Sequence, residues 1–142
     1  NLRPYQLDRL GLTQAIQSLV RVSAENSQVE FACRIDNIDG LFTAEDEMHI
    51  YRIIQEAMNN IIKHSQATEA TVVVKLGGGS VSIALRDNGR GLSLTQPPAN
   101  RGLGLSSMQE RATILGGTMK TDSQPGQGMN LQFEIPLPTA TK

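Results

Sequence analysis

The chain has 142 residues, of which 39% are hydrophobic and 19% are charged, and its formal net charge is −1. This size and composition predict one globular domain with a sizeable core and exclude a disordered chain. The near-neutral charge and the scarcity of aromatic residues argue against a nucleic-acid partner. The single cysteine, Cys33, excludes a disulfide framework and a cysteine-based metal site.

The two ends of the chain carry no targeting or membrane signal. No stretch approaches the roughly 18 apolar residues that a membrane span needs, and no signal peptide is present. Because the chain begins at Asn1 rather than Met, we expect it to be a piece of a longer protein.

In the first half, the hydrophobic pattern predicts a helix, a strand and a long second helix. Apolar residues from Leu12 to Val20 recur at helical spacing, with Thr13 as the expected cap, and Val29 to Ile35 alternate as in a strand. A capping box at 43–46 predicts a helix that runs to about His64. Its apolar stripe consists of Ile50, Ile53, Ile54, Ala57, Met58 and Ile61.

The second half predicts two hairpins separated by a long loop and a helix. Residues 71–76 and 81–87 form the first hairpin around a glycine-rich turn, and 88–101 form the loop. Capping boxes that begin at Ser106 or Ser107 predict a helix ending at Gly116-Gly117. Residues 118–123 and 129–135 form the second hairpin across Pro125-Gly-Gln-Gly128.

This order of elements predicts an α+β fold. Hairpins outnumber βαβ crossovers, so we expect a mixed, mostly antiparallel sheet with helices on one face rather than a doubly wound sheet.

The long predicted helix carries polar residues opposite its apolar stripe, namely His49, Arg52, Glu56, Asn60 and Lys63. A solvated face is the ordinary interpretation of such a sector. Asn59 and Asn60 are poor helix formers, however, and Glu56 and Asn60 lie one turn apart, so their oxygens can point at one site. An amide oxygen suits Mg²⁺, a carboxylate can act as a base, and Lys63 can lie near phosphates.

Three glycine clusters follow. Asp87-Asn-Gly-Arg-Gly91 places a carboxylate at a strand end, where it can accept from an amine, although a plain turn is an equal alternative. Gly102-Leu-Gly104 precedes a helix and suits phosphate, but it is a weak signal and no P-loop is present. Gly126-Gln-Gly128 is, on its own, most simply a tight turn.

In order, these pieces resemble the N, G1, G2 and G3 boxes of the GHKL superfamily, the Bergerat-fold ATPases. The match is closer to the catalytic domain of sensor histidine kinases. Residues 55–64, 102–112 and 115–117 are similar to the subfamily that pairs with helix-turn-helix response regulators. Leu2-Arg-Pro4 with Leu10-Gly-Leu12 resembles the segment that joins its dimerisation helices to the ATP-binding domain.

The resemblance implies a two-layer α/β sandwich that binds ATP and Mg²⁺. By this resemblance, Asp87 accepts from the adenine amino group, Asn60 binds Mg²⁺, and Glu56 is the base or orients a water. Lys63 and His64 lie near the phosphates, and 93–100 form an ATP lid. The nucleotide pocket is shaped by Gly89, Gly91, Gly102, Leu103, Gly104 and Leu105. One departure is Met129, which stands where relatives often carry a threonine that helps hold adenine, and Asn130 should point to the opposite face.

The resemblance also implies domains and partners. Residues 1–25 link the dimerisation region to the domain, 26–138 form the ATP-binding catalytic domain, and 139–142 are a tail. The γ-phosphate goes to a histidine on a separate dimerisation domain, because neither His49 nor His64 is followed by an acidic residue. The implied partners are that domain, in a homodimer, and a downstream response regulator. The implied location is a cytoplasmic domain of a membrane-bound sensor.

Two alternatives stay open at this point. One is an ATP-hydrolysing GHKL machine, which needs a further domain carrying a lysine that reaches the γ-phosphate. The other is a degenerate nucleotide-binding scaffold that has lost catalysis.

Overall fold

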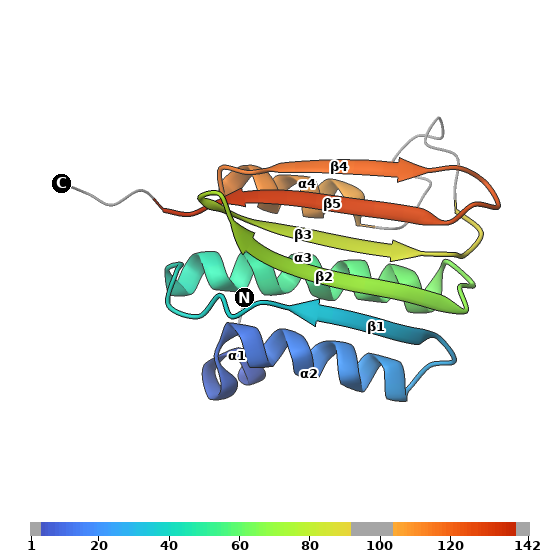
Figure 1. The fold of residues 1–142 in the computed structure, drawn as a ribbon, viewed down its shortest axis with the longest axis horizontal. Coiled ribbons are helices and arrows are strands. Elements are labelled where there is room, and N and C mark those ends of the chain that lie inside the picture. The colour runs from blue at the N-terminus through green and yellow to red at the C-terminus, as the bar shows by residue number, and fades with distance from the viewer. Residues whose placement is uncertain (1–3, 92–103, 139–142) are drawn as a thin grey trace.

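The structure is a computed structural model that describes residues 4–91 and 104–138. Its helices are α1 (Tyr5–Leu10), α2 (Leu12–Glu25), α3 (Ala44–Lys63) and α4 (Leu105–Ile114). Its strands are β1 (Glu30–Ile35), β2 (Glu69–Gly77), β3 (Ser80–Asp87), β4 (Thr118–Ser123) and β5 (Met129–Pro136). Figure 1 shows the sheet in front of α3 and α4, with α1 and α2 beside β1.

The five strands form one mixed sheet in the order β1-β2-β3-β5-β4. β1 and β2 are parallel and are connected through α3, whereas the other three pairs are antiparallel. A parallel pair needs such a crossover, while two-residue turns suffice for hairpins. The predicted α+β fold with a mixed, mostly antiparallel sheet is therefore confirmed.

One face of the sheet is buried beneath the helices. Along β2, β3 and β5 every second residue is buried, and register places these residues side by side: Val72 with Leu85 and Leu131, and Val74 with Ile83 and Phe133. The alternate residues are exposed or half-buried. This alternation is what a sheet covered on one side requires, and the layered arrangement confirms the expected two-layer sandwich.

Helix α3 begins and ends where the sequence predicts. The Thr43 side chain accepts a hydrogen bond from Asp46 N at 3.1 Å, and three acidic residues occupy the first turn, which suits the positive end of the helix dipole. The whole predicted apolar stripe is buried, together with Tyr51 and Asn60. No helix in the described ranges is both long enough and apolar enough to cross a bilayer.

Helix α2 is capped differently from the prediction. Its N-cap is Gly11, and Thr13 is the second residue of the helix. The Thr13 N–H donates to Asp39 Oδ1 at 2.8 Å, and its hydroxyl accepts from Ile38 N at 2.9 Å. The cap prediction for Thr13 was wrong because the acceptor for this helix end comes from a loop 26 residues away.

The short helix α1 was not predicted, because six residues are too few to show a helical period. Leu7 from α1 and Leu12, Ala15, Ile16 and Val20 from α2 belong to the same core as the sheet and α3. The proposed division of the chain at residue 25 stays a prediction.

Helix α4 begins at a glycine rather than at a serine. Gly104, with φ +68°, is the N-cap, so Ser106 and Ser107 lie inside the helix and the predicted capping boxes were wrong. The predicted end is confirmed. Gly116 N donates to Thr113 O and Gly117 N donates to Ala112 O, a pattern that closes a helix through a left-handed glycine.

Candidate functional site

Asp87 ends strand β3 on the helix-covered face of the sheet. Register places it between Ala70 and Met129, and only 8% of its surface is exposed. Its Oδ1 accepts a hydrogen bond from Gly89 N at 2.8 Å. Burial raises the pKa of the Asp87 carboxyl, and hydrogen bonds with the backbone of Gly89 and Met129 oppose this effect. A buried carboxylate held in this way is suited to accept a hydrogen bond from a ligand amine.

Three glycines around Asp87 allow backbone segments to touch. A Cβ at Gly89 would overlap the Ser65 carbonyl oxygen at the end of α3, and one at Gly128 would overlap the Asp87 carbonyl oxygen. A Cβ at Gly91 would overlap the Gln124 carbonyl oxygen in the β4–β5 turn. The glycines therefore bring the end of α3, the loop after β3 and the β4–β5 turn into direct contact, which a side chain would prevent.

Asn88 and Arg90 hold the same loop in place. The Asn88 side chain accepts from Thr68 N and Glu69 N and donates to Thr68 Oγ1, each at 3.0 Å. Arg90 N donates to Ser65 O at 2.6 Å, and Arg90 Nε donates to His64 O at 2.8 Å. The sequence did not predict these roles for Asn88 and Arg90. The turn-forming Asp-Asn-Gly pattern was the one feature that pointed to an ordered loop here.

The predicted site residues of α3 occupy its second half. Asn60 is buried at 6% exposure, Glu56 is half-buried, and Lys63 and His64 are exposed. Asn60 lies in the sector of α3 that the sequence predicts to be polar, yet its side chain is buried. This sector is therefore not simply a solvated face. His64 caps the helix, and its N–H donates to Asn60 O at 3.0 Å.

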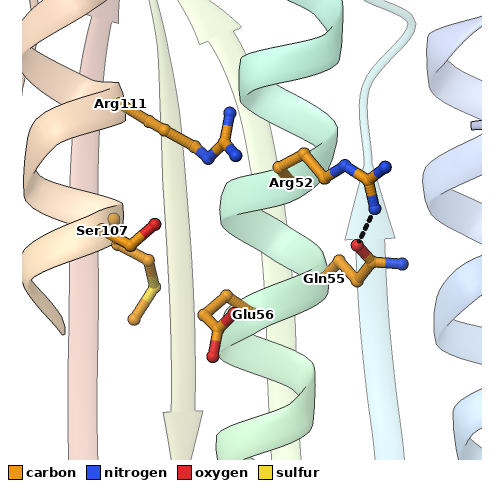
Figure 2. Close-up of a pocket in the computed structure, with 6 residues that line it drawn as sticks. Arg52, Gln55, Glu56, Ser107 and Arg111 are labelled. Atoms are coloured by element: carbon orange, nitrogen blue, oxygen red, sulfur yellow. Dashed lines mark hydrogen bonds between the residues drawn. The ribbon is translucent and has the colours of Figure 1, made fainter. Parts of the chain in front are cut away.

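The N-cap of helix α4, Gly104, lies against Glu56. A Cβ at Gly104 would lie 2.6 Å from Glu56 Oε2 and 2.8 Å from Glu56 Cγ, so the absence of a side chain there leaves room for the carboxylate. Glu56 also lines a groove of about 320 Å³ between α3 and α4. Figure 2 shows Glu56 and Ser107 on facing sides of these two helices.

The structure joins the predicted residues in two groups. Gly89 binds Asp87 and packs on the end of α3, and Gly91 packs on the β4–β5 turn. Glu56 meets Gly104 at the start of α4, beside the half-buried Leu105. Asp87 lines a separate pocket of about 420 Å³ at the ends of β3, β4 and β5. Gly102, Leu103 and the predicted lid at 93–100 lie outside the described residues.

Met129 shares the buried face with Asp87, and Asn130 lies in register with Arg86 and Asp122 on the opposite face. The predicted orientation of Asn130 is therefore confirmed by the strand alternation. Asn130 therefore points away from a ligand beside Asp87 and does not replace the threonine contact of relatives.

Comparison with known proteins places this arrangement in a family. A sequence model for the family described as histidine kinase-, DNA gyrase B- and HSP90-like ATPases matches residues 45–139. The chain is 33% identical over 140 residues to the signal transduction histidine-protein kinase/phosphatase DegS of Bacillus subtilis, covering 95% of this chain and 36% of DegS. It is 30% identical over 137 residues to the sensor histidine kinase LiaS of the same species, covering 96% of this chain and 37% of LiaS.

The fold also matches solved structures. The blue-light activated histidine kinase of Erythrobacter litoralis superposes with a TM-score of 0.75 at 18% identity, covering 89% of this chain and 42% of that one. At this identity the likeness concerns the fold alone. The chain spans a little over a third of the length of DegS and LiaS. Since the family match covers well over half of the residues, the chain belongs to the histidine kinase-, DNA gyrase B- and HSP90-like ATPases.

Proposed function

We propose that this chain is the catalytic domain of a sensor histidine kinase, which binds ATP with Mg²⁺ and donates the γ-phosphate to a histidine outside this chain. The observation that carries the proposal is the buried Asp87 carboxylate, which binds Gly89 N in a loop where glycines let backbone segments touch. Similarity to DegS and LiaS, both named as histidine kinases, supports the kinase over other members of the family.

In this proposal Asp87 selects the base. Its Oδ1 is already positioned by Gly89 N, so the carboxylate can accept from the adenine amino group without rearrangement. Asn at this position would still accept from Gly89, but its amide would present donors as well as an acceptor. Gly89, Gly91, Gly104 and Leu105, with Gly102 and Leu103 outside the described residues, would shape the rest of the nucleotide pocket.

The second half of α3 supplies the donors that a magnesium ion would need. Glu56 and Asn60 offer oxygen atoms one helical turn apart, and oxygen is the donor type that Mg²⁺ prefers. The described residues contain no cluster of three or more acidic, histidine or cysteine side chains that could cage a metal. This fits an ion held by Asn60 together with phosphates and water, which is common for nucleotide-bound Mg²⁺.

The remaining roles follow from position. Lys63 and His64 are exposed at the end of α3 and would lie near the phosphates, and Glu56 would act as the base or orient the attacking group. With Mg²⁺ bound, positioning and charge neutralisation would account for most of the acceleration. The partners would be the dimerisation domain of the parent, which would be a homodimer, and a response regulator. The parent would be a membrane-bound sensor with this domain in the cytoplasm.

A thermal-shift titration with ATP and Mg²⁺ tests nucleotide binding. At a ligand concentration of about 100 Kd, binding should add roughly 2.7 kcal/mol to the stability. Asp87→Asn should abolish most of the shift, and chelation of Mg²⁺ should reduce it. Glu69→Gln is a matched control, because it removes one exposed carboxylate at the start of the neighbouring strand. An unchanged shift in Asp87→Asn would refute the assigned role of Asp87.

Labelling with γ-phosphate separates the kinase from its alternatives. The isolated chain should bind ATP without labelling itself, whereas the full-length parent should form an acid-labile, base-stable phosphohistidine. Self-labelling of the isolated chain would contradict the proposal. Steady phosphate release without phosphohistidine would indicate an ATP-hydrolysing machine, and the absence of an ATP shift in the wild type would indicate a degenerate scaffold.

A further inference from the structure

Helices α3 and α4 meet at two contacts that lie about two turns apart. At one of them Gly104 lies against Glu56, where a Cβ on the glycine would be 2.6 Å from Glu56 Oε2. At the other, Arg111 Nη1 lies 2.8 Å from His49 Nδ1. Along each helix the two contact residues are seven positions apart, which is about 10 Å, and their order is reversed between the helices. The two helices therefore run antiparallel, and the groove between them lies beside both contacts.

The contact between His49 and Arg111 is a directional hydrogen bond. Arginine has donors only, so Nη1 donates and His49 Nδ1 must be the unprotonated nitrogen of the ring. Both side chains are half-buried, and a hydrogen bond with a charged donor is stronger than one between neutral groups. Figure 2 shows Arg111 reaching from α4 toward α3. This bond links the two helices through defined atoms.

The apolar contacts of α4 define its position less closely. Met108 and Ala112 are fully buried in the core, but apolar burial has no preferred direction. The N-cap is Gly104, and within the described part of the chain no side chain caps this end of the helix. A hydrogen bond, in contrast, tolerates only a narrow range of distance and angle. The bond to His49 is therefore suited to set how far α4 lies along α3, and with it the approach of Gly104 to Glu56.

We propose that His49 and Arg111 are positioning residues for phosphotransfer, which hold α4 where Gly104 restricts the Glu56 side chain. The inference rests on the proposed function, in which Glu56 acts as the base or orients the attacking group. Misplacing a reacting group by about 1 Å can lower a rate by about 100-fold. Asp87 lines a separate pocket. Loss of the bond should therefore slow transfer and leave ATP binding largely unchanged.

Substitutions at His49 test this role in the full-length parent. Asparagine carries an amide oxygen on Cγ, where histidine carries Nδ1, so His49→Asn keeps an acceptor that His49→Leu removes. At saturating ATP, His49→Leu should slow phosphohistidine formation by roughly 10- to 100-fold, and His49→Asn should recover most of the rate. Leucine is the better helix former, so rescue by asparagine cannot be attributed to helix propensity.

Double-mutant cycles show which groups act together. Arg111→Met should slow transfer by a similar factor, and adding His49→Leu to it should cause little further loss, because both remove the same bond. In a Glu56→Gln background His49→Leu should also have little further effect. Gln109→Met is the matched control and should leave the rate unchanged, since Gln109 is exposed and bonds to Thr113 within α4. The ATP thermal shift should persist in the His49 and Arg111 variants.

Nitrogen-15 NMR tests the bond independently of activity. The His49 signals, assigned by their loss in His49→Asn, should show an unprotonated Nδ1, and a proton on Nδ1 would overturn the inference. Wild-type rates in His49→Leu and Arg111→Met, fully additive losses in the cycles, or a reduced ATP shift would each overturn it and leave the proposed function intact. If the wild-type parent neither binds ATP nor forms phosphohistidine, the proposed function fails and the positioning role fails with it.

Discussion

Substituting two glycines of the β4–β5 turn tests how closely this turn packs on the loop after β3. Gly126 and Gly128 have almost the same backbone conformation, with φ of +80° and +82°. A Cβ at Gly126 would meet no heavy atom of the described chain within 4 Å. A Cβ at Gly128 would overlap the Asp87 carbonyl oxygen and lie 3.0 Å from the Asp87 carbonyl carbon. Alanine therefore imposes the same conformational strain at both positions and a steric clash at only one.

The two substitutions should differ by the energy of that clash. A left-handed alanine costs about 1–2 kcal/mol, so Gly126→Ala should lower the free energy of unfolding by about that amount. Gly128→Ala should add roughly 1–3 kcal/mol for overpacking, because the atoms in contact belong to backbone and cannot rotate away. Its total cost should therefore be about 2–5 kcal/mol.

Urea unfolding with linear extrapolation measures both values. The ATP thermal shift should persist in Gly126→Ala and be weakened in Gly128→Ala, since the second substitution displaces the backbone of Asp87. Equal losses of stability in the two variants, to within about 0.5 kcal/mol, would show that the turn does not pack on Asp87 as described.

Three further substitutions test the site. Burial raises the pKa of the Asp87 carboxyl above its ordinary value of 3.8. The folded chain therefore binds the proton of this carboxyl more tightly than the unfolded chain does. The free energy of unfolding should then fall as pH rises from 3.8 through the raised pKa, and urea titrations at several pH values should show this decline missing in Asp87→Asn. Asn88→Ala removes three hydrogen bonds to the α3–β2 connection and should cost about 1–3 kcal/mol of stability, measured by the same unfolding method. Gly104→Ala displaces the flexible Glu56 side chain, so labelling of the parent should slow at least tenfold while stability falls by only about 1–2 kcal/mol.

The elements that carry their own local signals were predictable. The Thr43 cap of α3, the Gly78-Gly79 turn and the alternation in β3 and β5 depend on nearby residues, and the structure reproduces each of them. The family was predicted from a resemblance, carried by Glu56 and Asn60 followed in order by the three glycine clusters. These features are encoded within a few residues, which is the range over which propensity and periodicity are informative.

The features that depend on distant contacts were not predictable. Threonine is a residue type that often caps helices, but here the side chain of Asp39, from another loop, accepts the hydrogen bond from the start of α2. Ser106 and Ser107 fit a capping box, but α4 begins after Gly104, which is left-handed and lies against Glu56 of a distant helix. The contact of Gly128 with Asp87 likewise arises only when β3 and β5 pair, so a turn was the simplest local interpretation.

The two N-terminal helices have a consequence for the smallest unit that can fold. The family match begins at residue 45, yet Leu7, Leu12, Ile16 and Val20 complete the core beneath α3 and the sheet. Burying these four side chains contributes on the order of 10 kcal/mol, which is comparable with the entire stability of a typical domain, about 5–15 kcal/mol. A fragment cut to residues 45–139 would lack these four side chains and leave the apolar surface that they cover exposed, so we expect it to be less stable than the whole chain. We therefore expect the smallest fragment that folds to include α1 and α2, although both helices precede every residue assigned to the nucleotide site.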